Sequence, residues 1–152
     1  MTVQTLDEMK VTAFAQRMMD TLNDAFLALM VSIGHQTGLF DVMSGLPPAT
    51  SEGIASKAGL QERYVREWLG AMVTGRVVDY DTDTATYALP PARAAYLTRA
   101  AGVDNLAMLM QYIALLGNVE DHVVSCFTDG GGVPYSAYPD FQRLMAEESA
   151  QI

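Results

Sequence analysis

Cysteine is almost absent from this sequence, which contains only Cys126 among 152 residues. A single cysteine excludes a disulfide within the chain and any metal cluster built on several thiolates, and it is typical of a reducing compartment. Cys126 itself lies in an apolar stretch, which predicts a buried side chain. The cysteine content therefore favours a cytoplasmic protein.

Basic side chains are also scarce, since 9 Lys and Arg stand against 18 Asp and Glu for a net charge of -9. Nucleic acids and anionic membranes attract clustered cations, so this balance disfavours both as general partners. The only histidines, His35 and His122, have no cysteine or second histidine at metal-ligand spacing. We therefore expect no metal site.

Long hydrophobic runs are missing as well. Residues 1–10 lack the apolar stretch of a signal peptide, and the most apolar run, residues 106–117, is too short to cross a bilayer. We therefore expect no membrane association, and the run is better interpreted as a buried or interface helix.

What the sequence does contain is helical periodicity in a chain that is 50% hydrophobic. Apolar residues recur at spacings of three and four over residues 7–33, which predicts one long helix. Residues 25–31 are apolar on every side, more than the surface of a small monomer tolerates. This pattern predicts a homodimer in which a second copy covers the helix.

The next segment predicts a winged helix-turn-helix. A short helix at 38–45 precedes helices at 51–57 and 62–74, the last with Val65, Leu69, Met72 and Val73 inward. The apolar period then changes to two around Val77, Val78 and Tyr80 and again around Tyr87 and Leu89, which predicts a hairpin, the wing. A short helix is expected at 92–98.

The C-terminal third predicts a second long helix over residues 103–127, with a possible kink at Gly117, ended by the glycines at 130–132. A loop at 133–139 and a final helix from Asp140 follow. The glycines precede a proline-containing loop rather than a helix, so they are interpreted as a helix end and not as a nucleotide-binding turn. The expected fold is mainly α, with long N- and C-terminal helices flanking the winged helix, in segments 1–37, 38–99 and 100–152.

A winged helix raises the possibility of DNA binding, but the local charges oppose it. Glu62 and Glu67 balance Arg63 and Arg66 on the candidate recognition helix, and the wing carries three aspartates. The alternative is a free-standing transcriptional regulator that holds a small effector and contacts DNA through Arg63, Arg66 and Arg76. The neutral helix and the acidic wing favour a protein-contacting winged helix instead.

Aromatic residues in the C-terminal third predict a small-molecule site, although core packing also explains such residues. The candidate substrate-binding residues are Tyr112, His122, Tyr135, Tyr138 and Phe141. His122 follows Glu120 and Asp121, so it fits a base oriented by a carboxylate, or simply a solvated helix face. No catalytic residue is assigned.

Four stretches resemble the N-terminal part of bacterial class I S-adenosylmethionine-dependent methyltransferases: GLFD at 38–41, IASKAG at 54–59, RYVREWL at 63–69 and GGGVPYSAYP at 130–139. The resemblance, which spans residues 27–145, implies a winged helix that mediates homodimerisation and a helical segment that covers a substrate cavity. It also implies that S-adenosylmethionine binds in a Rossmann-like domain beyond residue 152. This chain alone is then expected to bind no cofactor and to be catalytically silent.

Overall fold

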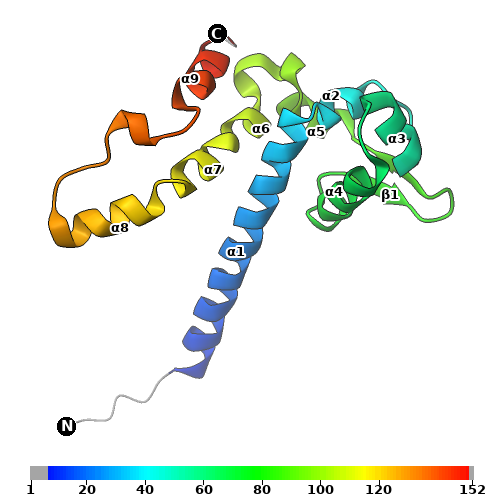
Figure 1. Cartoon of the computed structure of the whole chain (residues 1–152). Helices are drawn as coiled ribbons and strands as arrows, with labels where there is room; N and C mark the ends of the chain where they lie inside the picture. The colour runs from blue at the N-terminus through cyan, green and yellow to red at the C-terminus, as the bar shows by residue number, and fades with distance from the viewer. Residues whose placement is uncertain (1–6, 151–152) are drawn as a thin grey trace.

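The computed structural model describes residues 7–150, and most of them are helical (Figure 1). The first element is the long helix α1 (Glu8–Gln36), which confirms the helix predicted over 7–33. Asp7 begins it, because its carboxylate accepts a hydrogen bond from the backbone N–H of Lys10 at 3.4 Å. Only the C-terminal part of α1 is buried within the chain.

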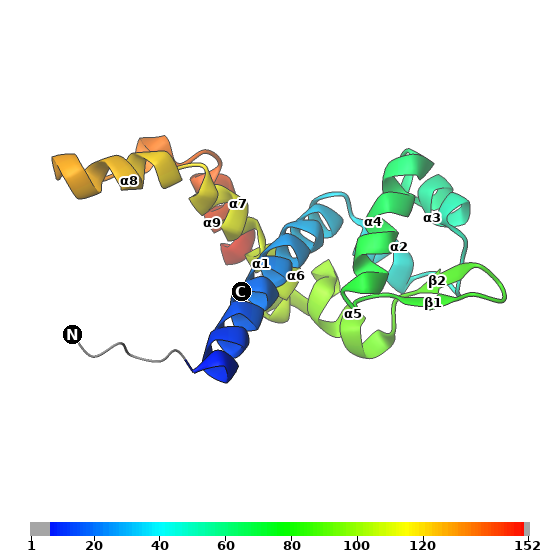
Figure 2. The same ribbon diagram turned by 90° about the horizontal axis from the view of Figure 1, so that it is seen from below.

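The winged helix-turn-helix is confirmed. Its elements are α2 (Leu39–Ser44), α3 (Ser51–Ala58), α4 (Glu62–Thr74), β1 (Asp79–Asp81), β2 (Thr86–Ala88) and α5 (Pro91–Leu97). The two strands pair antiparallel and project as the wing (Figure 2). Thr50 caps α3, and Gly59 ends it at φ +67°, a conformation that glycine adopts without strain.

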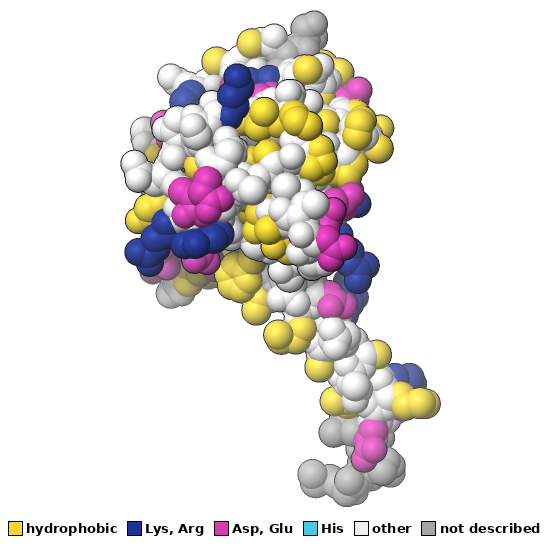
Figure 3. Space-filling model, turned by 90° about the vertical axis from the view of Figure 1, so that its right-hand side faces the viewer, with side chains coloured by type: hydrophobic (Ala, Val, Ile, Leu, Met, Phe, Trp, Pro, Cys, Tyr) yellow, Lys and Arg dark blue, Asp and Glu magenta, His cyan; other side chains and the backbone are white. Residues whose placement is uncertain are grey.

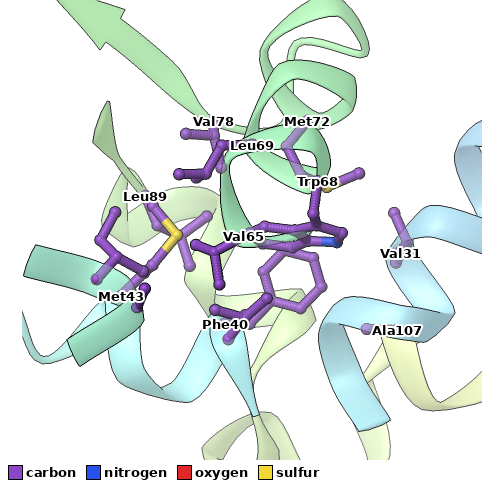
Figure 4. Close-up of a cluster of buried hydrophobic side chains, with 13 residues drawn as sticks. Val31, Phe40, Met43, Val65, Trp68, Leu69, Met72, Val78, Leu89 and Ala107 are labelled. Atoms are coloured by element: carbon purple, nitrogen blue, oxygen red, sulfur yellow. The ribbon is translucent and has the colours of Figure 1, made fainter. Parts of the chain in front are cut away.

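The main core lies between α1, the winged-helix elements and α6 (Figure 4). Val65, Leu69 and Met72 point into it as predicted, and Trp68 joins them. The Trp68 ring meets Phe40 edge to face, with centroids 5.2 Å apart, and its Nε1–H donates to the backbone oxygen of Met30 at 2.8 Å. These contacts attach α4 firmly to α1.

The prediction of one long helix over residues 103–127 is wrong. The chain there forms a 3₁₀ helix η1 (Arg99–Asp104) and the helices α6 (Leu106–Leu109), α7 (Gln111–Gly117) and α8 (Glu120–Asp129). Asn105 starts α6, because its buried side-chain oxygen accepts the N–H of Met108 at 3.1 Å. The break after Gly117 lies where a kink was expected.

Beyond α8 the glycine run ends the helix as predicted, with Gly130 at φ +72°. A short 3₁₀ helix η2 (Tyr135–Ala137) leads to the final helix α9 (Phe141–Ser149), which packs against α7. Helix α8 buries none of its residues, so the prediction of a buried Cys126 is also wrong and its side chain is partly exposed. In Figures 1 and 2, α1 and the α7–α8 arm diverge from a shared junction near α6.

Candidate functional site

The loop and helix after the glycine run form a small aromatic pocket. The ring centroids of Tyr135 and Phe141 lie 5.6 Å apart, and those of Tyr138 and Phe141 lie 6.2 Å apart. The cavity beside them has a volume of about 560 Å³ and is also lined by Ser136, Asp140, Gln142 and Arg143. A pocket of this size with aromatic walls and a few polar groups fits a small organic molecule. We refer to it as the aromatic pocket.

The other two residues of the predicted site lie elsewhere. Tyr112 is on α7, where its hydroxyl contacts helix α9 rather than the aromatic pocket. His122 is exposed on α8. The structure therefore brings Tyr135, Tyr138 and Phe141 together and leaves Tyr112 and His122 apart from them.

Tyr112 is held by a carboxylate. Its hydroxyl donates to Glu148 at 2.6 Å and also lies 3.3 Å from the sulfur of Met145. The hydrogen bond to Glu148, followed by burial and the carboxylate charge, raises the pKa of Tyr112 to about 12. The phenol therefore stays protonated and works as a donor that joins α7 to α9.

A polar network that the sequence analysis missed joins the last turn of α1 to α9. Nε2 of His35, in the last turn of α1, lies 2.6 Å from Oε1 of Glu147 on α9. The other carboxylate oxygen accepts from Gln111 at 3.2 Å and from Arg143 at 3.3 Å. The His35 side chain is 1% exposed and that of Glu147 28% exposed, so the contact is partly buried. We call these four residues the α1–α9 network.

The network keeps Glu147 ionised. Burial alone would raise the pKa of this carboxyl, but hydrogen bonds from His35 and Gln111 and the electrostatic attraction of His35 and Arg143 outweigh burial. The pKa of Glu147 is therefore lowered from its ordinary value. The carboxylate acts as a charged acceptor at neutral pH.

A second polar contact supports the same junction. The Arg99 guanidinium donates to the backbone oxygen of His35 at 2.9 Å and pairs with Asp41, whose carboxylate also accepts the Arg99 backbone N–H at 2.8 Å. The end of α1 is thus tied to α2 and η1 as well as to α9. A backbone acceptor on one side and a carboxylate on the other fix the direction in which α1 enters the junction.

Two exposed apolar surfaces lie on the diverging arms. The α1 apolar surface consists of Met9, Val11, Phe14, Met18, Met19, Leu22, Phe26 and Ile33. The α7–α8 apolar surface consists of Ile113, Leu116, Val123, Val124 and Phe127. Figure 3 shows hydrophobic side chains along the projecting stalk of α1. Contiguous apolar area of this kind marks an interaction surface.

The winged helix pairs part of its positive charge with carboxylates, whereas Arg63 and Arg76 form no ion pair with the described residues. Arg66 lies 3.7 Å from Glu62 on the same helix, and Arg93 pairs with Asp79 of the wing at 2.6 Å. In residues 7–150, no cluster of three or more His, Cys, Asp or Glu side chains is placed to hold a metal ion. None of the helices within that range is long and apolar enough to span a membrane.

Comparisons with known proteins agree with this architecture. Residues 25–99 match the family model described as the Rv2258c-like winged HTH domain. No curated protein sequence matches the chain. Among solved structures, the mitomycin 7-O-methyltransferase MmcR is 16% identical with a TM-score of 0.68, the match covering 95% of this chain and 45% of that one.

Two further structures show the same likeness. Human N-acetylserotonin methyltransferase, solved with S-adenosylmethionine, is 14% identical with a TM-score of 0.62, covering 100% of this chain and 48% of that one. The calicheamicin-biosynthesis methyltransferase CalO1, solved with S-adenosylhomocysteine, is 18% identical with a TM-score of 0.63. This match covers 97% of this chain and 46% of CalO1. The chain thus spans less than half the length of each of these methyltransferases. Its fold is that of their N-terminal part, and residues 25–99 are similar to the Rv2258c-like winged helix-turn-helix domain.

Proposed function

We propose that this chain is the dimerisation and substrate-enclosing N-terminal module of a cytoplasmic, S-adenosylmethionine-dependent methyltransferase that acts on a small molecule. The observation that carries the proposal is the fold match, which takes in nearly the whole chain but less than half of each methyltransferase. Such a module would exclude water and orient the methyl acceptor, and both effects accelerate transfer from an activated donor.

The diverging arms support a homodimer. Phe26 on α1 and Leu116 on α7 are each 58% exposed, and Phe127 on α8 is 89% exposed. Stable dimers bury on the order of 1,200 Å² or more, with apolar side chains at the centre. A second copy, whose own α1 and α8 present the same surfaces, would supply a complementary cover for both arms.

Light scattering on the purified chain tests the dimer. We expect twice the monomer mass for the unmodified protein, and the monomer mass for a Phe26→Asp, Leu116→Asp double variant, because two carboxylates would be buried without partners. The matched control is Tyr64→Asp, which places one carboxylate on an exposed helix position outside both surfaces. A monomeric unmodified protein, or a dimer that tolerates the double variant, would refute this part of the proposal.

The aromatic pocket is the proposed place of substrate contact, with Tyr135, Tyr138 and Phe141 against the ligand. Tyr112 would not contact the ligand but would hold α9 in place, since its hydroxyl donates to Glu148. His122, which is exposed on α8, lies outside this pocket. The chemistry of the pocket favours a planar, aromatic acceptor.

The described residues do not themselves fit the methyl donor. Donor recognition of this kind uses a glycine turn between a parallel strand and a helix, whereas Gly130 and Gly131 follow helix α8 and face open space. In residues 7–150 the paired strands are those of the wing. We therefore place the donor in sequence outside these residues.

Calorimetry with S-adenosylmethionine tests that placement. We expect no binding by residues 1–152 and binding by the protein extended with whatever follows Ile152 in its gene. Tight binding by the short chain would overturn the placement of the donor site. A stop codon directly after Ile152 would remove the enzyme proposal and leave the regulator alternative.

A further inference from the structure

Helix α9 is held by a small set of side chains. Leu144 is buried, Glu147 meets His35, and Glu148 meets Tyr112. Arg143 and Met145 add contacts to Gln111 and Tyr112 of α7. Phe141 lies one turn earlier and forms a wall of the aromatic pocket. The orientation of α9 therefore decides where this wall lies.

The His35–Glu147 contact is the most constrained of these. His35 lies 112 residues from Glu147 in sequence, and Asn105 faces its other ring nitrogen at 3.5 Å. The oxygen of the Asn105 side chain is occupied by the N–H of Met108, so its amide N–H₂ is the group that faces Nδ1 of His35. Nδ1 then accepts, which leaves the proton on Nε2 to be donated to Glu147.

The carboxylate is fully used by this arrangement. One oxygen accepts from His35 on α1, and the other accepts from Gln111 on α7 and Arg143 on α9 itself. Three elements thus converge on one charged group. Charge-assisted hydrogen bonds of this kind are shorter, stronger and more directional than neutral ones.

We propose that Glu147 is a positioning residue: its carboxylate latches α9 to the end of α1 through His35, and this latch fixes the Phe141 wall of the aromatic pocket. The role in substrate binding rests on the function proposed above, whereas the latch itself does not. Without the latch, α9 keeps Leu144 and its side-chain contacts to Tyr112 and Gln111 but loses its tie to α1, so the Phe141 wall is free to shift while the winged helix stays folded.

Hydrogen exchange and NMR test the latch without any ligand. In Glu147→Ala, we expect amide exchange across residues 141–149 to accelerate by about tenfold or more, with exchange across residues 62–74 unchanged. The ¹⁵N shift of His35 Nε2 and the ¹H shift of its proton should report a hydrogen bond to a carboxylate in the unmodified protein and lose this Nε2–H signature in Glu147→Ala. Contacts between the Phe141 and Tyr135 rings should weaken in the same variant.

Two further variants separate a specific latch from general loosening. Glu147→Gln keeps an oxygen that can accept from His35, so it should restore the Nε2–H signature and most of the protection. Glu148→Ala removes the neighbouring carboxylate and its Tyr112 contact, and it should leave the His35 signature intact.

Several results would overturn the proposal. The first is unchanged amide exchange of α9 in Glu147→Ala. The second is a His35 signature that is the same in Glu147→Ala as in the unmodified protein. The third is that the ring contacts of Phe141 persist although α9 exchanges faster. Failure of every tested acceptor to bind, with these three readouts as expected, would instead count against the proposed function and leave the latch in place.

Discussion

Gly34 lies where α1 passes closest to the aromatic core. A Cβ atom at this position would come within 2.5 Å of the Trp68 ring and 2.7 Å of the Phe40 ring, both of which are buried. We expect Gly34→Ala to destabilise the protein by about 2 kcal/mol, because neither ring can move without disturbing its neighbours. Urea unfolding followed by Trp68 fluorescence measures the change.

Gly70 provides the matched control for Gly34. It is also a helical glycine, but a Cβ there meets nothing within 4 Å. Gly70→Ala should stabilise the protein by up to about 1 kcal/mol, since alanine favours the helix. If both alanine variants shifted stability in the same direction, the close packing of α1 against Trp68 would be wrong.

Glu147 makes stability depend on acidic pH. Its pKa is lowered by folding, so its contribution is present above the ordinary value of 4.5 and is lost as the pH falls through the lowered folded value. The unmodified protein should therefore be more stable than Glu147→Gln at neutral pH, with the difference shrinking well below pH 4.5. Parallel urea titrations at the two pH values measure this. A difference that grows with acidity would show that the carboxyl is not stabilised in its ionised form.

At the scale of elements, the sequence pattern predicted those helices whose position depends on interactions between residues close together in the sequence. The helix over 7–33 and the helix-turn-helix follow from apolar spacing, and their ends follow from capping by Asp7 and Thr50 and from Gly59. The break at Asn105 was missed because the apolar spacing continues through it. What starts α6 there is a side-chain cap whose other end faces His35, and that partner is distant in sequence.

The site was predictable only in part for the same reason. Tyr135, Tyr138 and Phe141 lie within one short segment, so its high aromatic content was enough to predict them as site residues. The His35–Glu147 contact joins residues 112 apart, and no spacing rule connects them. An acid on the inner face of α9 three residues after Leu144 was the available signal, but it had no visible partner.

The surface of α4 and the wing predicts weak interaction with DNA. Arg66 is paired with Glu62 and Arg93 with Asp79, and the wing also carries Asp81 and Asp83, so this surface offers phosphates no excess of positive charge. We expect no binding of duplex DNA at physiological salt in a fluorescence anisotropy titration. Sub-micromolar binding with a steep salt dependence, abolished by Arg63→Ala and Arg66→Ala together, would favour the regulator alternative.

At the scale of the whole molecule, the splayed arms predict that helix content depends on concentration. The buried residues of α1 begin at Ala28, so the turns before it have little burial within the chain. In proteins most helical stability comes from packing of an apolar face, so this segment has little to hold it in the monomer. Circular dichroism should therefore gain helical signal as dilute protein is concentrated through the dimer range. A signal independent of concentration, with the mass changing, would show that α1 is stable by itself.

The order of synthesis sets when the arms can be covered. The α1 apolar surface leaves the ribosome before α8, which begins at Glu120. The two arms diverge from their junction, so neither covers the other (Figure 1). During translation the exposed leucines, methionines and phenylalanines of α1 would thus be a natural binding site for chaperones, and nascent chains on one messenger RNA would be the first partners available to replace them.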